Sequence, residues 1–147
     1  MADIEELDTN FLLSLIRNQL NSFEQTYDAL PTLEIQSVYI NGSFGGQQAT
    51  SASDLDVTIE LGVVSSEYQM NPVSLVDRIM DFGGVVATGV TDVVPYYADV
   101  TVIPSEEILA DAGMESAPTA WQHVKQTQSH GGYDTVYDVH AQDYRRI

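Results

Sequence analysis

Residues 54–61 alternate strictly between polar and aliphatic side chains, and this pattern constrains the architecture of the chain more than any other. In an extended segment, alternate side chains project from opposite faces. One face here is polar, with Asp54, Asp56, Thr58 and Glu60, and the other is aliphatic, with Leu55, Val57, Ile59 and Leu61. A half-buried strand of this kind needs other elements to cover its aliphatic face. The pattern therefore predicts a β-sheet with packed helices, and it places two aspartates on the same face of one strand.

The N-terminal region predicts a helix followed by a strand. Apolar residues recur at helical spacing between Leu7 and Tyr27. Asp8 or Thr9 can cap the start of this helix, because a short polar side chain accepts a hydrogen bond from a free backbone N–H there. Residues 33–40 then have the pattern of a strand.

Asn41-Gly42, at the end of that strand, allows two interpretations. The pair is typical of a tight hairpin turn, which requires a second strand directly after it. Residues 43–53, however, are rich in Gly, Gln, Ser and Thr and show no alternation. We therefore favour a glycine turn that is followed by a short helix or loop.

The rest of the chain predicts alternating helices and strands. In order, we expect a helix from Asn71-Pro72 to Gly83-Gly84, a β-branched strand at 85–94, a strand at 96–103, a short helix from Pro104, a helix at 118–128, a turn at 129–132 and a final strand at 133–139. The expected apolar stripe of the first of these helices comprises Val73, Val76, Ile79 and Met80. With 147 residues, 44% of them apolar, the chain fits a single α/β (α+β) domain spanning 1–147, a mixed sheet with helices packed on it.

The charge of the chain is unusual. It has 22 acidic and 5 basic residues, a net charge of -17, and the acidic residues are spread along its length. Such a surface repels itself in dilute buffer, whereas at molar salt the Debye length falls to about 3 Å and the repulsion is screened. We therefore expect a cytoplasmic protein of a halophilic microorganism, such as an archaeon, or of its virus. An acidic protein from a low-salt cytoplasm is the alternative.

Composition also limits the partners and sites that we expect. The chain has no cysteine, which excludes disulfides and thiolate metal sites. No apolar run approaches the roughly 20 residues that span a membrane, and the acidic start lacks a signal-peptide pattern, so we expect no membrane partner. There is no basic patch, so charge does not support a nucleic acid partner, although molar salt weakens that argument because it also screens phosphate repulsion.

Residues 42–57 contain the motif from which a function can be argued. Gly42-Ser43 follows an apolar strand, and a spacer of ten residues separates it from Asp-Leu-Asp-Val at 54–57. A third aspartate, Asp99, lies between apolar neighbours on a later expected strand. This arrangement resembles the nucleotidyltransferase superfamily of DNA polymerase beta. In that family Gly-Ser, a spacer of similar length and Asp-apolar-Asp-apolar are followed by a third strand-borne carboxylate.

The chemistry of these carboxylates is consistent with a metal site. Asp54 and Asp56 project from the same face of a strand, with Cα atoms about 6.6 Å apart. Short carboxylates at that spacing can converge on two metal ions that lie about 3.5–4 Å apart. Hard oxygen ligands suit Mg²⁺ or Mn²⁺, and three clustered acids would raise one another's pKa unless a cation were present. We therefore expect Asp54, Asp56 and Asp99 to bind a divalent metal.

The resemblance implies a role for each residue of the motif. Asp54 and Asp56 would ligate both metal ions, and Asp99 would ligate the catalytic metal and assist loss of the acceptor proton. Gly42 and Ser43 would hold the triphosphate of a nucleoside triphosphate. The reaction would move a nucleoside monophosphate, with AMP expected, onto a hydroxyl.

The resemblance also implies a class of partner. The chain covers the catalytic core and little more, as in stand-alone minimal nucleotidyltransferases. Those proteins often pair with a small helical partner protein, and some act as antitoxins that modify it. Nucleic acid and aminoglycoside acceptors remain open.

One departure from the family supports a different function. Many members carry Arg or Lys in the loop after Gly-Ser, and this loop has none, which leaves Arg78 and Lys125 as candidates to meet the triphosphate charge. The alternative is a catalytically degenerate module that binds a nucleotide or a partner protein, and a structural or virion-associated acidic domain is a third possibility. Three histidines match no metal motif and are expected to have surface or structural roles: His123, His130 and His140.

Overall fold

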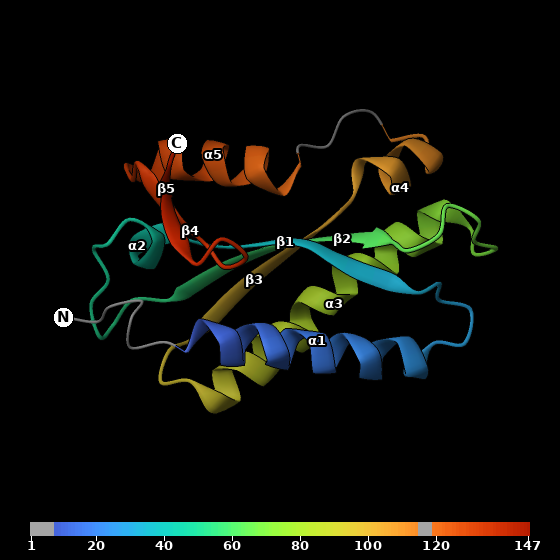
Figure 1. Ribbon diagram of the computed structural model, residues 1–147, viewed down its shortest axis with the longest axis horizontal. Coiled ribbons are helices and arrows are strands. Elements are labelled where there is room, and N and C mark those ends of the chain that lie inside the picture. The colour runs from blue at the N-terminus through green and yellow to red at the C-terminus, as the bar shows by residue number, and fades with distance from the viewer. Residues whose placement is uncertain (1–7, 115–118) are drawn as a thin grey trace.

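The computed structural model describes residues 8–114 and 119–147, which form one mixed sheet with helices packed on it. The strand order is β3-β2-β1-β4-β5, and β2 and β3 are the parallel pair. The strands are β1 (Leu33–Asn41), β2 (Leu55–Val63), β3 (Ala98–Pro104), β4 (Thr135–Asp138) and β5 (Asp143–Arg146). The helices are α1 (Thr9–Thr26), α2 (Gly42–Gly45), α3 (Pro72–Val93), α4 (Glu106–Asp111) and α5 (Ala120–Gly131). Helices α1 and α3 lie on one side of the sheet and α5 on the other (Figure 1), so the predicted fold class is confirmed.

The first helix and strand form where the sequence predicts them. The side chain of Asp8 caps α1 by accepting a hydrogen bond from the N–H of Phe11. One face of α1 is buried against the sheet and α3, and it carries Leu12, Ile16, Leu20 and Phe23. Burial of such a side chain stabilises the fold by about 1.5–3 kcal/mol, which makes this face the main attachment of the helix.

The connection between β1 and β2 is not a tight hairpin. The chain forms the single-turn helix α2 directly after β1, and it then continues to β2 through residues 46–54. β1 and β2 still pair antiparallel, with Asn41 opposite Asp56. The preferred interpretation of Asn41-Gly42, a glycine turn followed by a short helix, is confirmed.

Helix α3 is longer than predicted, and the strand predicted at 85–94 is wrong because these residues form the end of this helix and the residue after it. The helix continues through Gly83 and Gly84. A Cβ at Gly83 would lie 3.2 Å from the carbonyl oxygen of Val100 on β3, so glycine here allows helix and strand to pack closely and does not end the helix. Neither α3 nor another helix of the described residues is both long and apolar enough to cross a membrane.

The buried face of α3 also differs from the predicted stripe. Val73 and Met80 are 47% and 59% exposed, so their assignment to the core was wrong. The buried stripe runs along both halves of the helix and comprises Leu75, Val76, Ile79, Phe82, Val86 and Val90. The β-branched residues of 85–94 fit a helix because their spacing places Val86 and Val90 on the buried face.

Gly84→Ala is expected to stabilise the protein by about 0.5–1 kcal/mol, because alanine has the higher helix propensity. A Cβ at Gly84 has no heavy atom of another element within 4 Å, so nothing opposes the gain. Urea unfolding at equal salt measures the difference. Gly83→Ala is the matched control, and it should fail to stabilise because its Cβ would press on Val100. Equal stabilisation by both alanines would contradict the close contact between α3 and β3.

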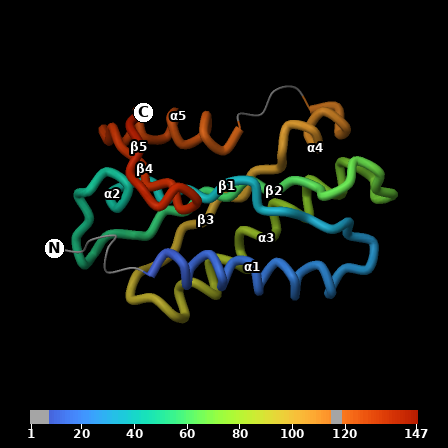
Figure 2. The backbone as a smooth tube through the Cα atoms, viewed as in Figure 1, coloured from blue at the N-terminus to red at the C-terminus, as the bar shows by residue number. Residues whose placement is uncertain are grey.

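The C-terminal region contains a longer helix and one more strand than predicted. Helix α5 ends at Gly131 and is followed by the C-cap Gly132, whose φ of 79° is the left-handed conformation typical of that position. Most of the turn predicted at 129–132 is therefore helical. Pro118, the predicted start of this helix, lies outside the described residues. β4 and β5 form a hairpin that lies beside α2 (Figure 2), and Thr135 donates a hydrogen bond to the carbonyl of Gly45, 90 residues away in sequence.

Most acidic side chains of the described residues have no ion-pair partner. The ion pairs found there are Arg78–Asp81, Arg145–Asp138 and Arg146–Asp134. We therefore expect the free energy of unfolding to rise as KCl is raised from about 0.1 M to 2 M, because the Debye length falls below about 3 Å.

Chemical unfolding at several salt concentrations measures this effect. The control is a variant in which three exposed acids become amides: Asp28→Asn, Glu34→Gln and Asp77→Asn. It should gain less stability from salt than the parent. An identical gain in both proteins would show that salt acts through something other than acidic self-repulsion.

Candidate functional site

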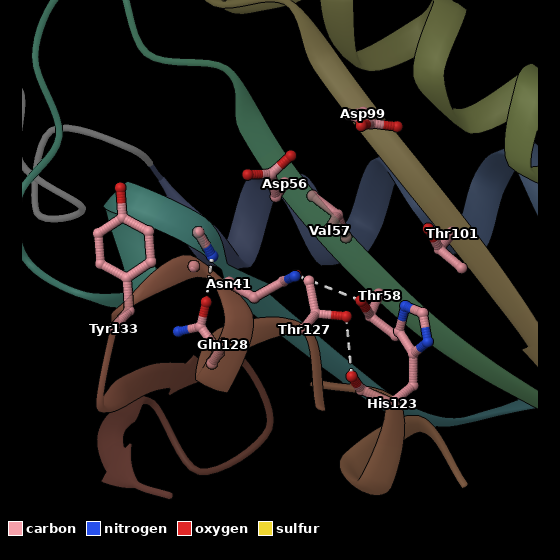
Figure 3. A pocket seen from close by; sticks show the side chains of 12 residues that line it. Asn41, Asp56, Val57, Thr58, Asp99, Thr101, His123, Thr127, Gln128 and Tyr133 are labelled. Atoms are coloured by element: carbon pink, nitrogen blue, oxygen red, sulfur yellow. Dashed lines mark hydrogen bonds between the residues drawn. The ribbon is translucent and has the colours of Figure 1, made fainter. Parts of the chain in front are cut away.

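A pocket of about 250 Å³ lies between α5 and the polar face of the sheet (Figure 3). Helix α5 packs mainly over β1 and β2, so the β3 side of this face stays open and Asp99 and Thr101 are exposed. The pocket is lined by Asn41, Gly42, Asp56, Val57, Thr58, Asp99, Thr101, His123, Thr127, Gln128, Gly131 and Tyr133.

Two rows of side chains form the sheet side of this pocket. Asp56 on β2 lies opposite Asp99 on β3, and Thr58 lies opposite Thr101. Because the two strands are parallel neighbours about 4.8 Å apart, opposite residues project from the same face. We name the first pair the carboxylate row and the second the hydroxyl row. The rows are about 6.6 Å apart along the strands, and the carboxylate row is the one beside the end of β1.

Asp56 occupies an unfavourable environment for a negative charge. Its partial burial, and then the charges of Asp99 and Asp54, raise the pKa of its carboxyl from 3.8 to about 6. No Lys or Arg occurs among the residues that line the pocket in the described part of the chain. The carboxylate row therefore lacks a compensating cation from the protein, and a ligand that brings positive charge would be stabilised there.

Gly42 forms the turn that brings the end of β1 next to Asp56. Its φ of 67° lies in the left-handed region, where residues with a Cβ are strained. A Cβ at this position would also overlap the carboxylate of Asp56. Glycine is therefore required here for two reasons, since both the turn and the position of Asp56 depend on it.

Gln128 connects α5 to this turn. Its side chain is 1% exposed, and its Oε1 accepts a hydrogen bond of 2.9 Å from the N–H of Gly42. Its Nε2 donates to the carbonyl of Thr135, at the start of β4. One buried amide thus joins the helix, the glycine turn and the C-terminal hairpin. Figure 3 shows Gln128 on the pocket side of this connection.

The structure brings together three of the five residues that the sequence singled out. Asp56, Asp99 and Gly42 line the pocket. Asp54 is exposed and precedes β2 by one residue, and it acts on Asp56 through its charge without lining the pocket. Ser43 is partly buried in α2 and does not line the pocket either.

Neither basic residue proposed to meet the triphosphate charge lines the pocket. Arg78 lies on α3, at the other face of the sheet, with its guanidinium carbon 4.5 Å from the centre of the Tyr27 ring. Lys125 is on α5, where its ammonium nitrogen lies 5.2 Å from the centre of the Trp121 ring. The sequence motif alone did not place either side chain, and the fold separates both from the carboxylate row.

The pocket contains residues that sequence reasoning missed. Thr58 and Thr101 could have been found, because they follow the two aspartates by two residues and so share their face. The apolar residues Ala120 and Val124 mark the face of α5 that packs on the sheet, but they do not indicate that this packing forms a pocket beside Asp56. The pocket-lining residues of α5 are His123, Thr127, Gln128 and Gly131. No local pattern predicted Tyr133, because its position depends on tertiary packing. Its ring lies in the space left by Gly46 and Gly131, and a Cβ at Gly46 would overlap the ring.

The donor groups of the pocket fit a hard divalent cation such as Mg²⁺. Within residues 8–114 and 119–147, no three acidic or histidine side chains already lie close enough to enclose a metal ion. Mg²⁺, however, is commonly held by one or two carboxylates together with substrate phosphates and water. Two uncompensated carboxylates side by side, one with a raised pKa, are a donor set of that kind.

The chain was compared with known families, proteins and structures. No protein-family model matches it, and no curated protein and no solved structure shows significant similarity. The chemistry of the pocket is therefore the basis for a proposed function.

Proposed function

We propose that the chain is a metal-dependent nucleotidyltransferase that moves a nucleoside monophosphate, with AMP expected, from a nucleoside triphosphate to a hydroxyl acceptor. The observation that carries the proposal is the carboxylate row beside the Gly42 turn, in a pocket whose described lining has no Lys or Arg. A polyanionic substrate binds such a pocket when divalent cations accompany its phosphates. The resemblance of residues 42–57 and Asp99 to the polymerase beta superfamily supports the same reaction.

Asp56 and Asp99, together with Asp54 at the edge of the site, would hold Mg²⁺ or Mn²⁺. When bound, the metal would neutralise phosphate charge and polarise the α-phosphate towards attack. Gly42 contributes close backbone approach, because its lack of a side chain leaves the turn open beside Asp56. Ser43 is assigned to the triphosphate by resemblance, through its hydroxyl group.

The acceptor that we propose is a hydroxyl on a protein or small molecule. Binding of a polynucleotide depends on Lys and Arg contacts to phosphates, and the pocket lining offers none in the described chain. The basic side chains of β5 are ion-paired, Arg145 with Asp138 and Arg146 with Asp134. A small helical partner protein, as in antitoxin-type minimal nucleotidyltransferases, remains the acceptor suggested by resemblance.

Transfer of label from α-labelled nucleoside triphosphates tests the proposal. The protein would be incubated in high-salt buffer with Mg²⁺ or Mn²⁺, with and without the product of the neighbouring gene. We expect metal-dependent release of pyrophosphate and label on a protein or small molecule, and the labelled species identifies the acceptor; label on RNA would overturn the choice of acceptor. No transfer from any of the four nucleotides would contradict the proposal.

The missing cation favours a second candidate function, a catalytically degenerate module that binds a metal–nucleotide complex. Without Lys or Arg in its described lining, the pocket has little to stabilise the charge that develops on leaving pyrophosphate. This candidate predicts metal-dependent ATP binding by calorimetry with no release of pyrophosphate. Binding together with release selects the enzyme.

A further inference from the structure

The pocket has two chemically different ends. The carboxylate row and the Gly42 turn lie at one end, together with Gln128 and Tyr133. The hydroxyl row lies one step further along β2 and β3. Both of its side chains are neutral, so this end offers no carboxylate to a metal ion. Thr58 is buried and its hydroxyl donates to the Oδ1 of Asn41, whereas Thr101 is exposed. This end is the part of the pocket left for the second substrate.

His123 projects into this second end from α5. Figure 3 shows its ring beside Thr58 and Thr101, on the opposite side of the pocket from Tyr133. The ring has no hydrogen-bond or ion-pair partner among the described residues, although its backbone N–H and carbonyl bond to Thr119 and Thr127 within the helix. A partly buried imidazole that faces a pocket without a partner is available to a ligand.

The protonation state of His123 suits a proton acceptor. Burial lowers the pKa of its imidazole below the ordinary 6.5, so the ring is neutral near pH 7. A neutral imidazole has a nitrogen lone pair that accepts a hydrogen bond from a hydroxyl. The other histidines, His130 and His140, are exposed and do not line the pocket.

We propose that His123 binds the acceptor hydroxyl and takes its proton, which makes the His123 end of the pocket the acceptor site. The inference rests on the proposed nucleotidyl transfer. The hydroxyl oxygen forms a bond to the α-phosphorus while its proton passes to a ring nitrogen of His123. The bond between the α-phosphorus and the bridging oxygen breaks, pyrophosphate leaves, and the imidazolium returns its proton to solvent. Asp99, to which the resemblance assigned the proton, is then free to serve as a metal ligand.

The test compares His123→Ala, His123→Gln and the control His130→Ala, which changes an exposed histidine on the same helix. Release of pyrophosphate from ATP with Mn²⁺ is measured in high salt, where water serves as the acceptor when no other hydroxyl is added. We expect kcat to fall roughly 100-fold in both His123 variants, with the KM for ATP changed less than about 3-fold. Added imidazole should restore activity to His123→Ala, and His130→Ala should match the parent.

The outcomes separate this inference from the function on which it rests. A parent that releases no pyrophosphate overturns both. A parent that is active, with folded His123 variants of equal kcat, overturns the acceptor site alone. A loss that imidazole does not restore, or one that appears mainly in the KM for ATP, assigns His123 to packing or to the nucleotide and also overturns it. Circular dichroism of His123→Gln, the more conservative variant, shows whether a loss reflects unfolding.

Discussion

Asp56→Asn is expected to abolish nucleotidyl transfer and, without divalent metal, to raise the free energy of unfolding at neutral pH. Asparagine keeps the shape of the side chain but removes the charge that would bind metal, so we expect transfer to fall at least about 100-fold. The same change removes a charge that the folded protein destabilises. A catalytic loss that accompanies a gain in stability is typical of a functional site and not of a structural one.

The direction of the stability effect follows from the pKa of Asp56. Burial and two neighbouring carboxylates raise this pKa from 3.8 to about 6 in the folded protein. Between these values the folded state binds more protons than the unfolded state, so the parent loses stability as pH rises through this window. The penalty is complete above the folded pKa. Because the side chain is partly exposed, solvent screening reduces it to about 1 kcal/mol.

Urea unfolding of parent and variant between about pH 4 and pH 8 measures this difference. Asp56→Asn should be nearly equal to the parent at the acid end and more stable at the neutral end. Excess Mn²⁺ should stabilise the parent and not the variant, which reverses the order. Asp77→Asn is the control, since it removes an equal charge from an exposed position on α3. If Asp77→Asn gives the same gain, the effect comes from net charge and not from the carboxylate row.

Gly42→Ala is expected to cause the second large loss. Alanine at a φ of 67° strains the backbone by roughly 1–2 kcal/mol, and its Cβ would displace the carboxylate of Asp56. We expect transfer to fall at least about 100-fold, because displacement of a reacting group by an ångström can reduce the rate by that factor. Assays of pyrophosphate release and thermal unfolding measure the two effects.

Gly113→Ala separates strain from displacement. Gly113 has a φ of 69°, but a Cβ there meets no heavy atom within 4 Å. This variant should show a similar loss of stability and unchanged transfer. If Gly42→Ala lost only as much activity as Gly113→Ala, the close approach of Gly42 and Asp56 would have no role in the reaction.

The parts of the fold that the sequence predicted correctly depend on local signals. The alternation of residues 54–61 identified β2 and the face on which Asp56 lies, and Asp8 marked the start of α1. The strand predicted at 85–94 was wrong because β-branched residues fit either a strand or a buried helix face. The glycine pair does not end the helix, and the role of Gly83, which is to let α3 pack closely on β3, depends on a tertiary contact that no local pattern indicates.

The parts of the site that were missed depend on tertiary contacts. β5 is short and mostly exposed, and it has no alternation for a sequence pattern to detect. Gln128 and His123 belong to the site because α5 crosses the polar face of the sheet; Ala120 and Val124 mark the buried face of this helix, but they do not indicate that it packs on the polar face beside Asp56. The sequence alone predicted that Asp56 and Asp99 belong to one site, because each lies on a predicted strand. The parallel register of β2 and β3 places them side by side.

The buried amide of Gln128 has a consequence for how the pocket can open. Both of its polar atoms are engaged, one by the N–H of Gly42 and the other by the carbonyl of Thr135. A displacement of α5 that admits a larger ligand would break these bonds and leave two backbone groups without partners, at about 1–3 kcal/mol for each group that stays buried. The position of α5 over the pocket and the conformation of the Gly42 turn are thus thermodynamically linked. A molecule that binds between α5 and the sheet therefore also alters the affinity of the Gly42 turn for its own ligand.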